Sequence, residues 1–190
     1  MAKKEMDVVK GLDLQRYMGR WYEIASFPSR FQPKDGINTR ATYTLNSDVT
    51  VHVLNETWSG GKRGYIEGTA YKADPKSDEA KLKVKFYVPP FLPIIPVVGD
   101  YWVLYIDDDY RYALIGQPSR NYLWVCLWFS FLLLILFSGC VFMVDLCMFL
   151  VLSFLDSVWK ERKCKYMHST NTFKIQGFAL YMFVFVLLPS

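Results

Sequence analysis

Few residues in this sequence have the type and spacing that catalysis or metal binding requires. His52 lies in a predicted strand with no Cys or His at ligand spacing, which is typical of an ordinary strand histidine. Three consecutive acids, Asp107–Asp109, stand between two predicted strands and are more typical of a solvated hairpin tip than of a metal site. All 4 cysteines lie after Trp124, so the preceding residues contain no cysteine nucleophile. We therefore expect a protein that is not an enzyme and that holds neither a metal nor a cofactor.

The elements that position these residues are short segments in which apolar and polar residues alternate. In Lys81–Phe86 the lysines alternate strictly with apolar residues, so Leu82, Val84 and Phe86 are predicted to share one inward face. Turn-forming residues separate the segments, as in an antiparallel sheet whose strands follow chain order. The predicted fold is all-β, an eight-stranded antiparallel up-and-down barrel with room for one small apolar ligand. We expect strands at residues 21–27, 38–45, 49–57, 64–72, 80–87, 101–106, 110–116 and 121–124.

Three segments, in order along the chain, resemble the signatures of one protein family. They are Gly19-Arg20-Trp21, Gly99-Asp100-Tyr101-Trp102 and Ala113–Trp124. Their order and spacing resemble the lipocalins, most closely the plant temperature-induced lipocalins, with bacterial outer-membrane lipocalin and apolipoprotein D as more distant relatives. The resemblance covers about residues 8–124. It implies the lipocalin barrel, with Gly19 and Trp21 as the signature of the barrel floor.

The resemblance also implies a function and a set of ligand contacts. It implies that the barrel binds a small hydrophobic ligand (lipid, fatty acid or sterol-like) and associates with membranes in temperature or oxidative stress tolerance. Similarity to apolipoprotein D implies that inward residues of the second, third and last predicted strands line the cavity. Glu23 is expected to face the base of the barrel, where a ligand anchor, a structural hydrogen bond and a catalytic role all stay open. The candidate ligand-binding residues are Ala41, Tyr43, Val53, Asn55, Phe86 and Trp124.

An uncharged, proline-rich segment at residues 86–98 interrupts the predicted strands. Its prolines are too dense for a central strand, so we expect a loop. Apolar residues exposed on a loop typically mark contact with a membrane surface or a partner, and the alternative is a loop that folds over the barrel mouth and buries itself. If the loop enters a membrane, the contact residues are Phe91, Leu92, Ile94 and Ile95.

Charge and the first residues of the chain bear on partners and location. The 22 basic and 18 acidic residues are nearly balanced, which gives no basic patch for nucleic acid. Residues 1–7 are charged and lack the apolar run of about 7–15 residues that a signal peptide needs. We therefore expect a small hydrophobic ligand and a membrane as partners, no nucleic acid, and a location on the cytoplasmic side of the plasma membrane.

The composition of the chain changes where the resemblance ends. Residues 1–124 are predicted to form the barrel domain, incomplete at its last strand. Residues 125–190 are predicted to form a hydrophobic tail in place of the C-terminal helix and last strand that the resemblance implies. Residues 123–144 carry no charge and are long enough for a possible transmembrane segment.

A second explanation of the tail is translation of a retained intron. The product would then be a membrane-tethered or non-functional splice form that no longer binds ligand. Trp128 stands where the family has an arginine that covers the tryptophan of the first strand. Without that arginine, Trp21 is expected to be uncovered.

Overall fold

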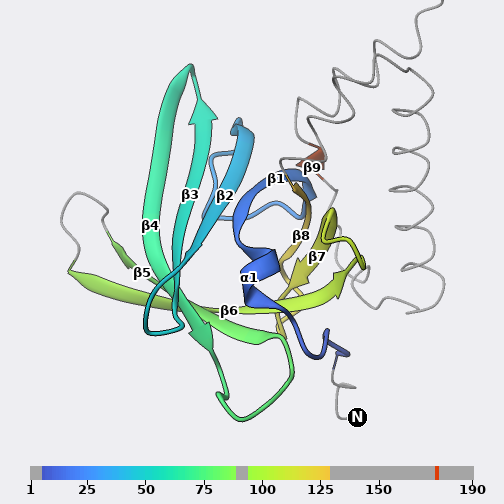
Figure 1. Ribbon diagram of the computed structural model, residues 1–190. Helices are drawn as coiled ribbons and strands as arrows, with labels where there is room; N and C mark the ends of the chain where they lie inside the picture. The colour runs from blue at the N-terminus through green and yellow to red at the C-terminus, as the bar shows by residue number, and fades with distance from the viewer. Residues whose placement is uncertain (1–5, 89–93, 129–173, 176–190) are drawn as a thin grey trace, which may run out of the picture.

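The sheet of this protein is a closed barrel whose strands follow one another in chain order. The computed structural model describes residues 6–88, 94–128 and 174–175 (Figure 1). Each strand from β1 to β8 pairs with the next, and β1 also pairs antiparallel with β8, which closes the barrel and confirms the predicted fold. A further short strand, β9, pairs with β1 at Ala25 and Ser26. The elements are α1 (Leu14–Tyr17), β1 (Gly19–Ser26), β2 (Ile37–Leu45), β3 (Val51–Ser59), β4 (Lys62–Lys72), β5 (Lys81–Val88), β6 (Ile95–Ile106), β7 (Tyr112–Gly116), β8 (Leu123–Trp128) and β9 (Lys174–Ile175).

Two strands, β6 and β8, extend beyond their predicted bounds by four or more residues. β6 begins at Ile95, inside the segment predicted as a loop, and pairs with β5 as far as Val88 to form a two-stranded ribbon. Pro96 fits there because β7 pairs only with the part of β6 from Trp102 onward, so one edge of the ribbon needs no N–H donor. β8 continues past Trp124 to Trp128 because alternate residues of the segment stay buried.

The transmembrane segment predicted at residues 123–144 is wrong at its start, because residues 123–128 form β8. Residues 129–144 lie outside the described residues, and so does the rest of the predicted tail apart from β9. In the part of the chain that the structure describes, no helix has the length and apolar character needed to cross a bilayer.

Side chains on the two faces of the sheet form two apolar clusters. The inner cluster fills one end of the barrel and includes Trp21, Tyr43 and Val103. The outer cluster lies against β1, β6, β7 and β8, where the N-terminal segment packs on it. A register shift in β1 between Glu23 and Ala25 sends Ala25 to the outer cluster. The buried residues of the outer cluster are Ala25, Phe27, Leu104, Leu114, Leu123 and Val125.

One end of the barrel, here called the floor, is closed by α1 and two tryptophans. Tyr17 of α1 stacks on Trp21 with ring centroids 4.8 Å apart, and Trp21 Nε1 donates a hydrogen bond to the Tyr17 carbonyl at 2.9 Å. Trp128 pairs with Trp21 across β1 and β8, and its Nε1 donates to the Met18 carbonyl at 3.2 Å. Gly19 has a φ of 111°, and a Cβ there would lie 2.8 Å from Trp128 Nε1. Trp21 is 1% exposed, so the prediction that it would be uncovered is wrong.

Candidate functional site

The predicted ligand-binding residues lie together on the inner wall of the barrel. Tyr43 and Val53 face each other across β2 and β3, and both are buried in the inner cluster. Asn55 is half-buried and pairs with Ala41 one step closer to the open end. The remaining predicted residues come from three different strands and pack against the inner cluster. They are Ala41, Phe86 and Trp124.

The inner wall stays open to solvent above the floor, toward the end that carries the loops at residues 27–36, 60–61 and 117–122 and the last residues of β5. We call this end the mouth. Phe86, Trp124 and Cys126 face inward but keep partial exposure, whereas Trp21 at the floor does not. Solvent therefore reaches the middle of the barrel from the mouth.

A small cavity lies at the floor, beneath this open part. It is lined by residues around α1 and by inner residues of five strands, and its free space is about that of one water molecule. Only Tyr43 among the predicted site residues borders it. Most of the lining is apolar. Lining residues that the sequence did not single out include Leu12, Tyr17, Met18, Ala70 and Tyr101.

Three tyrosine hydroxyls meet above this cavity. The Tyr101 hydroxyl lies 2.7 Å from that of Tyr17 and 3.0 Å from that of Tyr43. Burial is the main cause that raises the pKa of all three phenols, and their proximity to one another adds to the rise for Tyr17 and Tyr101. The hydroxyls therefore stay protonated and neutral. No local pattern in the sequence predicts this cluster, because it joins side chains from α1, β2 and β6.

An acid and a thiol face the interior at mid-height. Glu23 is buried, and it accepts hydrogen bonds from Ser26 Oγ at 2.7 Å and from Gln32 Nε2 at 2.6 Å. These contacts tie the loop at residues 27–36 to the inner wall, as expected for the structural role left open for Glu23. Cys126 pairs with Glu23 in register, and burial, then the nearby carboxylate, raises the pKa of its thiol. A thiol held protonated in this way is a poor nucleophile.

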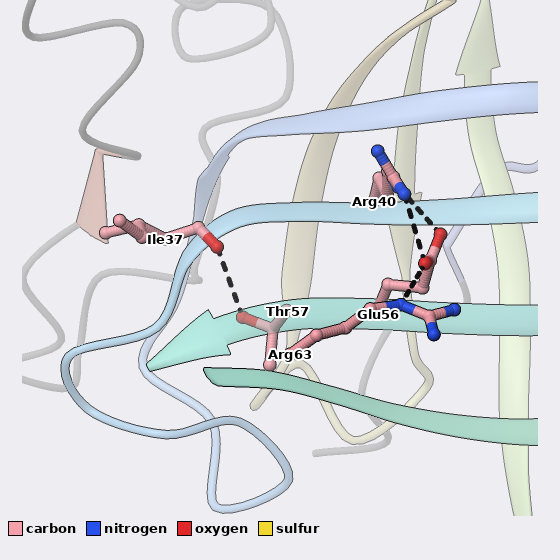
Figure 2. Close-up of polar contacts among 5 residues, drawn as sticks. All are labelled: Ile37, Arg40, Glu56, Thr57 and Arg63. Carbon is pink, nitrogen blue, oxygen red and sulfur yellow. Dashed lines mark hydrogen bonds and ion pairs between the residues drawn. The ribbon is translucent and has the colours of Figure 1, made fainter. Parts of the chain in front are cut away.

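Outside the barrel near the mouth, one buried carboxylate binds two arginines (Figure 2). Glu56 accepts hydrogen bonds from Arg40 Nε at 2.7 Å and Nη2 at 3.1 Å, and from Arg63 Nε at 2.6 Å. The Arg40 guanidinium also lies over the Trp58 ring, and that of Arg63 lies over the Tyr65 ring. Hydrogen bonds from Arg40, and then from Arg63, hold the pKa of the Glu56 carboxyl below its usual value. This network fastens β2, β3 and β4 together.

The end of the β5–β6 ribbon is the most exposed apolar part of the described residues. Ile94 is 66% exposed and Ile95 58% exposed, and Val98 and Tyr87 are also exposed. The ribbon and the β3–β4 hairpin point in different directions at the mouth (Figure 1). Of the predicted membrane-contact residues, Phe91 and Leu92 lie outside the described residues.

Aromatic rings line another part of the mouth and lead inward. Phe31 lies against Tyr122 with ring centroids 5.5 Å apart, and Tyr122 stacks on Trp124 at 5.7 Å with an interplanar angle of 6°. Phe31 comes from the loop at residues 27–36. Tyr122 directly precedes β8, and Trp124 is the second residue of that strand. The three rings therefore form a continuous aromatic surface at the mouth.

The polar residues whose types could serve catalysis or metal binding make structural contacts. Asp107 is buried, and it accepts hydrogen bonds from the backbone N–H groups of Arg111 and Tyr112 and from Arg111 Nε, so only the rest of the predicted hairpin tip is solvated. His52 lies on the outer wall, 3.4 Å from a Glu67 oxygen. Among the described residues, no group of three His, Cys, Asp or Glu side chains could hold a metal.

The comparisons with known proteins agree with one another. Residues 12–127 match the family model described as a lipocalin-like domain. The chain is 85% identical over 123 residues to "Temperature-induced lipocalin-1" of Arabidopsis thaliana, a match that covers 65% of this chain and 66% of that protein. It is 38% identical over 126 residues to "Outer membrane lipoprotein Blc" of Citrobacter freundii, covering 64% of this chain and 65% of that protein. The chain thus spans just under two thirds of the length of these relatives.

A solved structure shows the same fold. The structure of insecticyanin from the tobacco hornworm Manduca sexta aligns with a TM-score of 0.54 at 25% sequence identity. The alignment covers 65% of this chain and 67% of that one.

Proposed function

This chain belongs to the lipocalin family, and from that premise we propose that its barrel carries one small hydrophobic ligand on the inner wall. The observation that supports this most is the placement of the candidate residues, which share one inner face while Phe86 and Trp124 stay partly exposed toward the mouth. We propose a ligand that is lipid, fatty acid or sterol-like, because the inner wall is mainly apolar. We also propose a carrier without enzymatic activity.

Ligand binding should be detectable through tryptophan fluorescence. Trp124 faces inward, so a bound apolar molecule should quench it, and we expect dissociation constants in the micromolar range or below, about −8 kcal/mol or tighter. Tyr43→Ala should weaken binding about tenfold because it removes a buried ring from the inner wall. Titration of fatty acids and sterols into the wild-type protein and the variant measures both effects.

Two controls make this experiment decisive. Trp124→Phe identifies the part of the quenching signal that comes from Trp124. Tyr65→Ala removes a ring on the outer wall that is 55% exposed, and it should leave affinity unchanged. Absence of saturable quenching across the panel would contradict the carrier proposal, and equal affinity of Tyr43→Ala and wild type would place the ligand elsewhere.

We further propose that the protein associates peripherally with a membrane through the end of the β5–β6 ribbon, at the cytoplasmic face of the plasma membrane. The exposure of Ile94 and Ile95 supports a membrane contact, because moving exposed apolar side chains from water into lipid lowers the free energy. A role in temperature or oxidative stress is proposed from the 85% identity to a relative named temperature-induced lipocalin.

Replacing Phe91, Ile94 and Ile95 together by Ser should reduce binding to phosphatidylcholine vesicles by at least about tenfold. Each side chain would contribute about 1.5–3 kcal/mol if fully buried in lipid, and partial insertion gives less. Vesicle co-sedimentation measures the partition. Val49→Ser is the matched control, because Val49 is 67% exposed at the floor end of the barrel. If the triple variant and wild type partition equally, the ribbon does not contact the membrane.

A further inference from the structure

The hydroxyl cluster at the floor has one more proton than its own hydrogen bonds can use. Tyr17, Tyr43 and Tyr101 carry one hydroxyl proton each. Two hydrogen bonds join the three oxygens, with Tyr101 in the middle, and these bonds use two of the protons. The third proton is left to donate. Because Tyr101 can accept from either neighbour or donate to either, the free donor can be presented by any of the three oxygens.

A buried hydroxyl group that donates no hydrogen bond costs free energy unless another group supplies an acceptor. Tyr17 is 4% exposed, and Tyr43 is also buried. Tyr101, the central member of the cluster, is half-buried, and so is Cys126, which lies near the cluster on the inner face of β8. An acceptor that enters from the mouth can therefore reach the cluster.

The surroundings of the cluster are neutral. The groups that act electrostatically on the three phenols are the other phenols and the Cys126 thiol. The register places two lysines on the inner face of the described strands, both at ends of β4. Lys62 is exposed at the tip of the β3–β4 hairpin, and Lys72 donates to the Ser77 carbonyl at 2.7 Å.

We propose that the hydroxyl cluster of Tyr17, Tyr43 and Tyr101 binds one neutral acceptor oxygen, such as a ketone or ester carbonyl, at the deep end of an apolar ligand. This proposal rests on the proposed carrier function and narrows its ligand class. A ligand carbonyl oxygen loses its hydrogen bond to water when it enters the barrel. The hydrogen bond that it accepts from the free hydroxyl donor replaces that bond. A carboxylate at the same depth would bring a full charge next to one neutral donor, and burying a charge without a cation is far more costly.

The test compares three ligands that share one apolar chain. They are a saturated long-chain methyl ketone, the fatty acid of equal length and the corresponding alkane, each competing with a fluorescent probe bound to the full-length protein. We expect the ketone to bind more tightly than both of the others. The triple variant Tyr17→Phe/Tyr43→Phe/Tyr101→Phe, which removes all three hydroxyls and keeps the rings, should weaken ketone binding about threefold to tenfold and leave alkane binding unchanged.

Two further variants separate recognition from structural effects. Tyr43→Phe removes a terminal hydroxyl and keeps the bond between Tyr17 and Tyr101, so we expect a smaller loss for the ketone. Tyr65→Phe, on the outer wall, should have no effect. If the triple variant binds the ketone as well as wild type does, or if the fatty acid binds more tightly than the ketone, the proposal is overturned and the cluster holds only water. If none of the three ligands binds, the carrier function itself fails.

Discussion

Trp21→Ala is expected to lower the free energy of unfolding by about 3–5 kcal/mol, the usual cost of deleting a fully buried large aromatic side chain. Trp21 is 1% exposed, so the deletion leaves a cavity at the floor. It also removes the stack on Tyr17 and the donor to the Tyr17 carbonyl. The midpoint of guanidinium unfolding, measured by circular dichroism, gives the loss.

Trp58→Ala is the matched control for this prediction. Trp58 lies on the outer wall, where it is partly exposed and contacts the Arg40 guanidinium. Its removal should cost about 1 kcal/mol, since no closed cavity forms. If the two variants lose equal stability, Trp21 does not support the barrel in the way that its burial indicates.

Glu56→Gln is expected to cost about 1.5–3 kcal/mol at neutral pH, the range for hydrogen bonds to a charged group. Glu56 is 4% exposed, whereas its two arginine partners are more accessible and can find water, which limits the loss. Glutamine keeps the size of the side chain but has one acceptor oxygen and no charge. The pair of arginines in Figure 2 would then repel each other across β2 to β4.

The effect of this variant should depend on pH in one direction. The folded-state pKa of Glu56 is lowered, chiefly by the Arg40 hydrogen bonds. Its stabilising contribution is therefore complete above the unfolded pKa of about 4.3 and is lost as the pH falls through the lower folded value. The difference between wild type and Glu56→Gln should shrink when unfolding is measured from pH 7 down to acidic pH. A difference that stays constant with pH would contradict the ion-pair account.

Glu67→Gln controls for removal of a carboxylate from the same outer wall. Glu67 is exposed on β4 and lies 3.4 Å from His52 Nε2. Exposed pairs of this kind contribute about 0–1 kcal/mol. The variant should therefore unfold close to the wild-type midpoint.

The alternation of apolar and polar residues predicted most of the barrel strands, because it reflects which side chains of a strand are buried. In β5 the predicted inward residues Leu82 and Val84 are buried, and Phe86 packs against the inner cluster. In β2 and β3 the alternation placed residues on a shared face, and the resemblance to apolipoprotein D implied that this face is the inner one, where Tyr43 and Val53 are buried. Two strands, β6 and β8, were predicted four or more residues too short at one end, since proline content and the end of the family resemblance are local signals that pairing with β5, β1 and β7 overrides.

The floor shows what a sequence pattern cannot predict. The missing family arginine indicated an uncovered Trp21, yet the contacts of Tyr17 and Trp128 close the floor around it. The hydroxyl cluster depends on atoms from α1, β2 and β6 meeting within about 3 Å. Neither arrangement follows from neighbouring residues, because each joins segments that are far apart in the chain.

The pairing of β1 with β8 has a consequence for the order of events during synthesis. Trp21 leaves the ribosome early, whereas its register partner Trp128 belongs to the last strand of the barrel. The Trp21 side chain therefore stays exposed, or in transient contacts, until the whole barrel sequence has been translated. Contacts between such distant residues form slowly because the chain must first close a long loop. We expect newly made chains to depend on chaperones in this interval, and chains that stall before β8 to be recognised as unfolded.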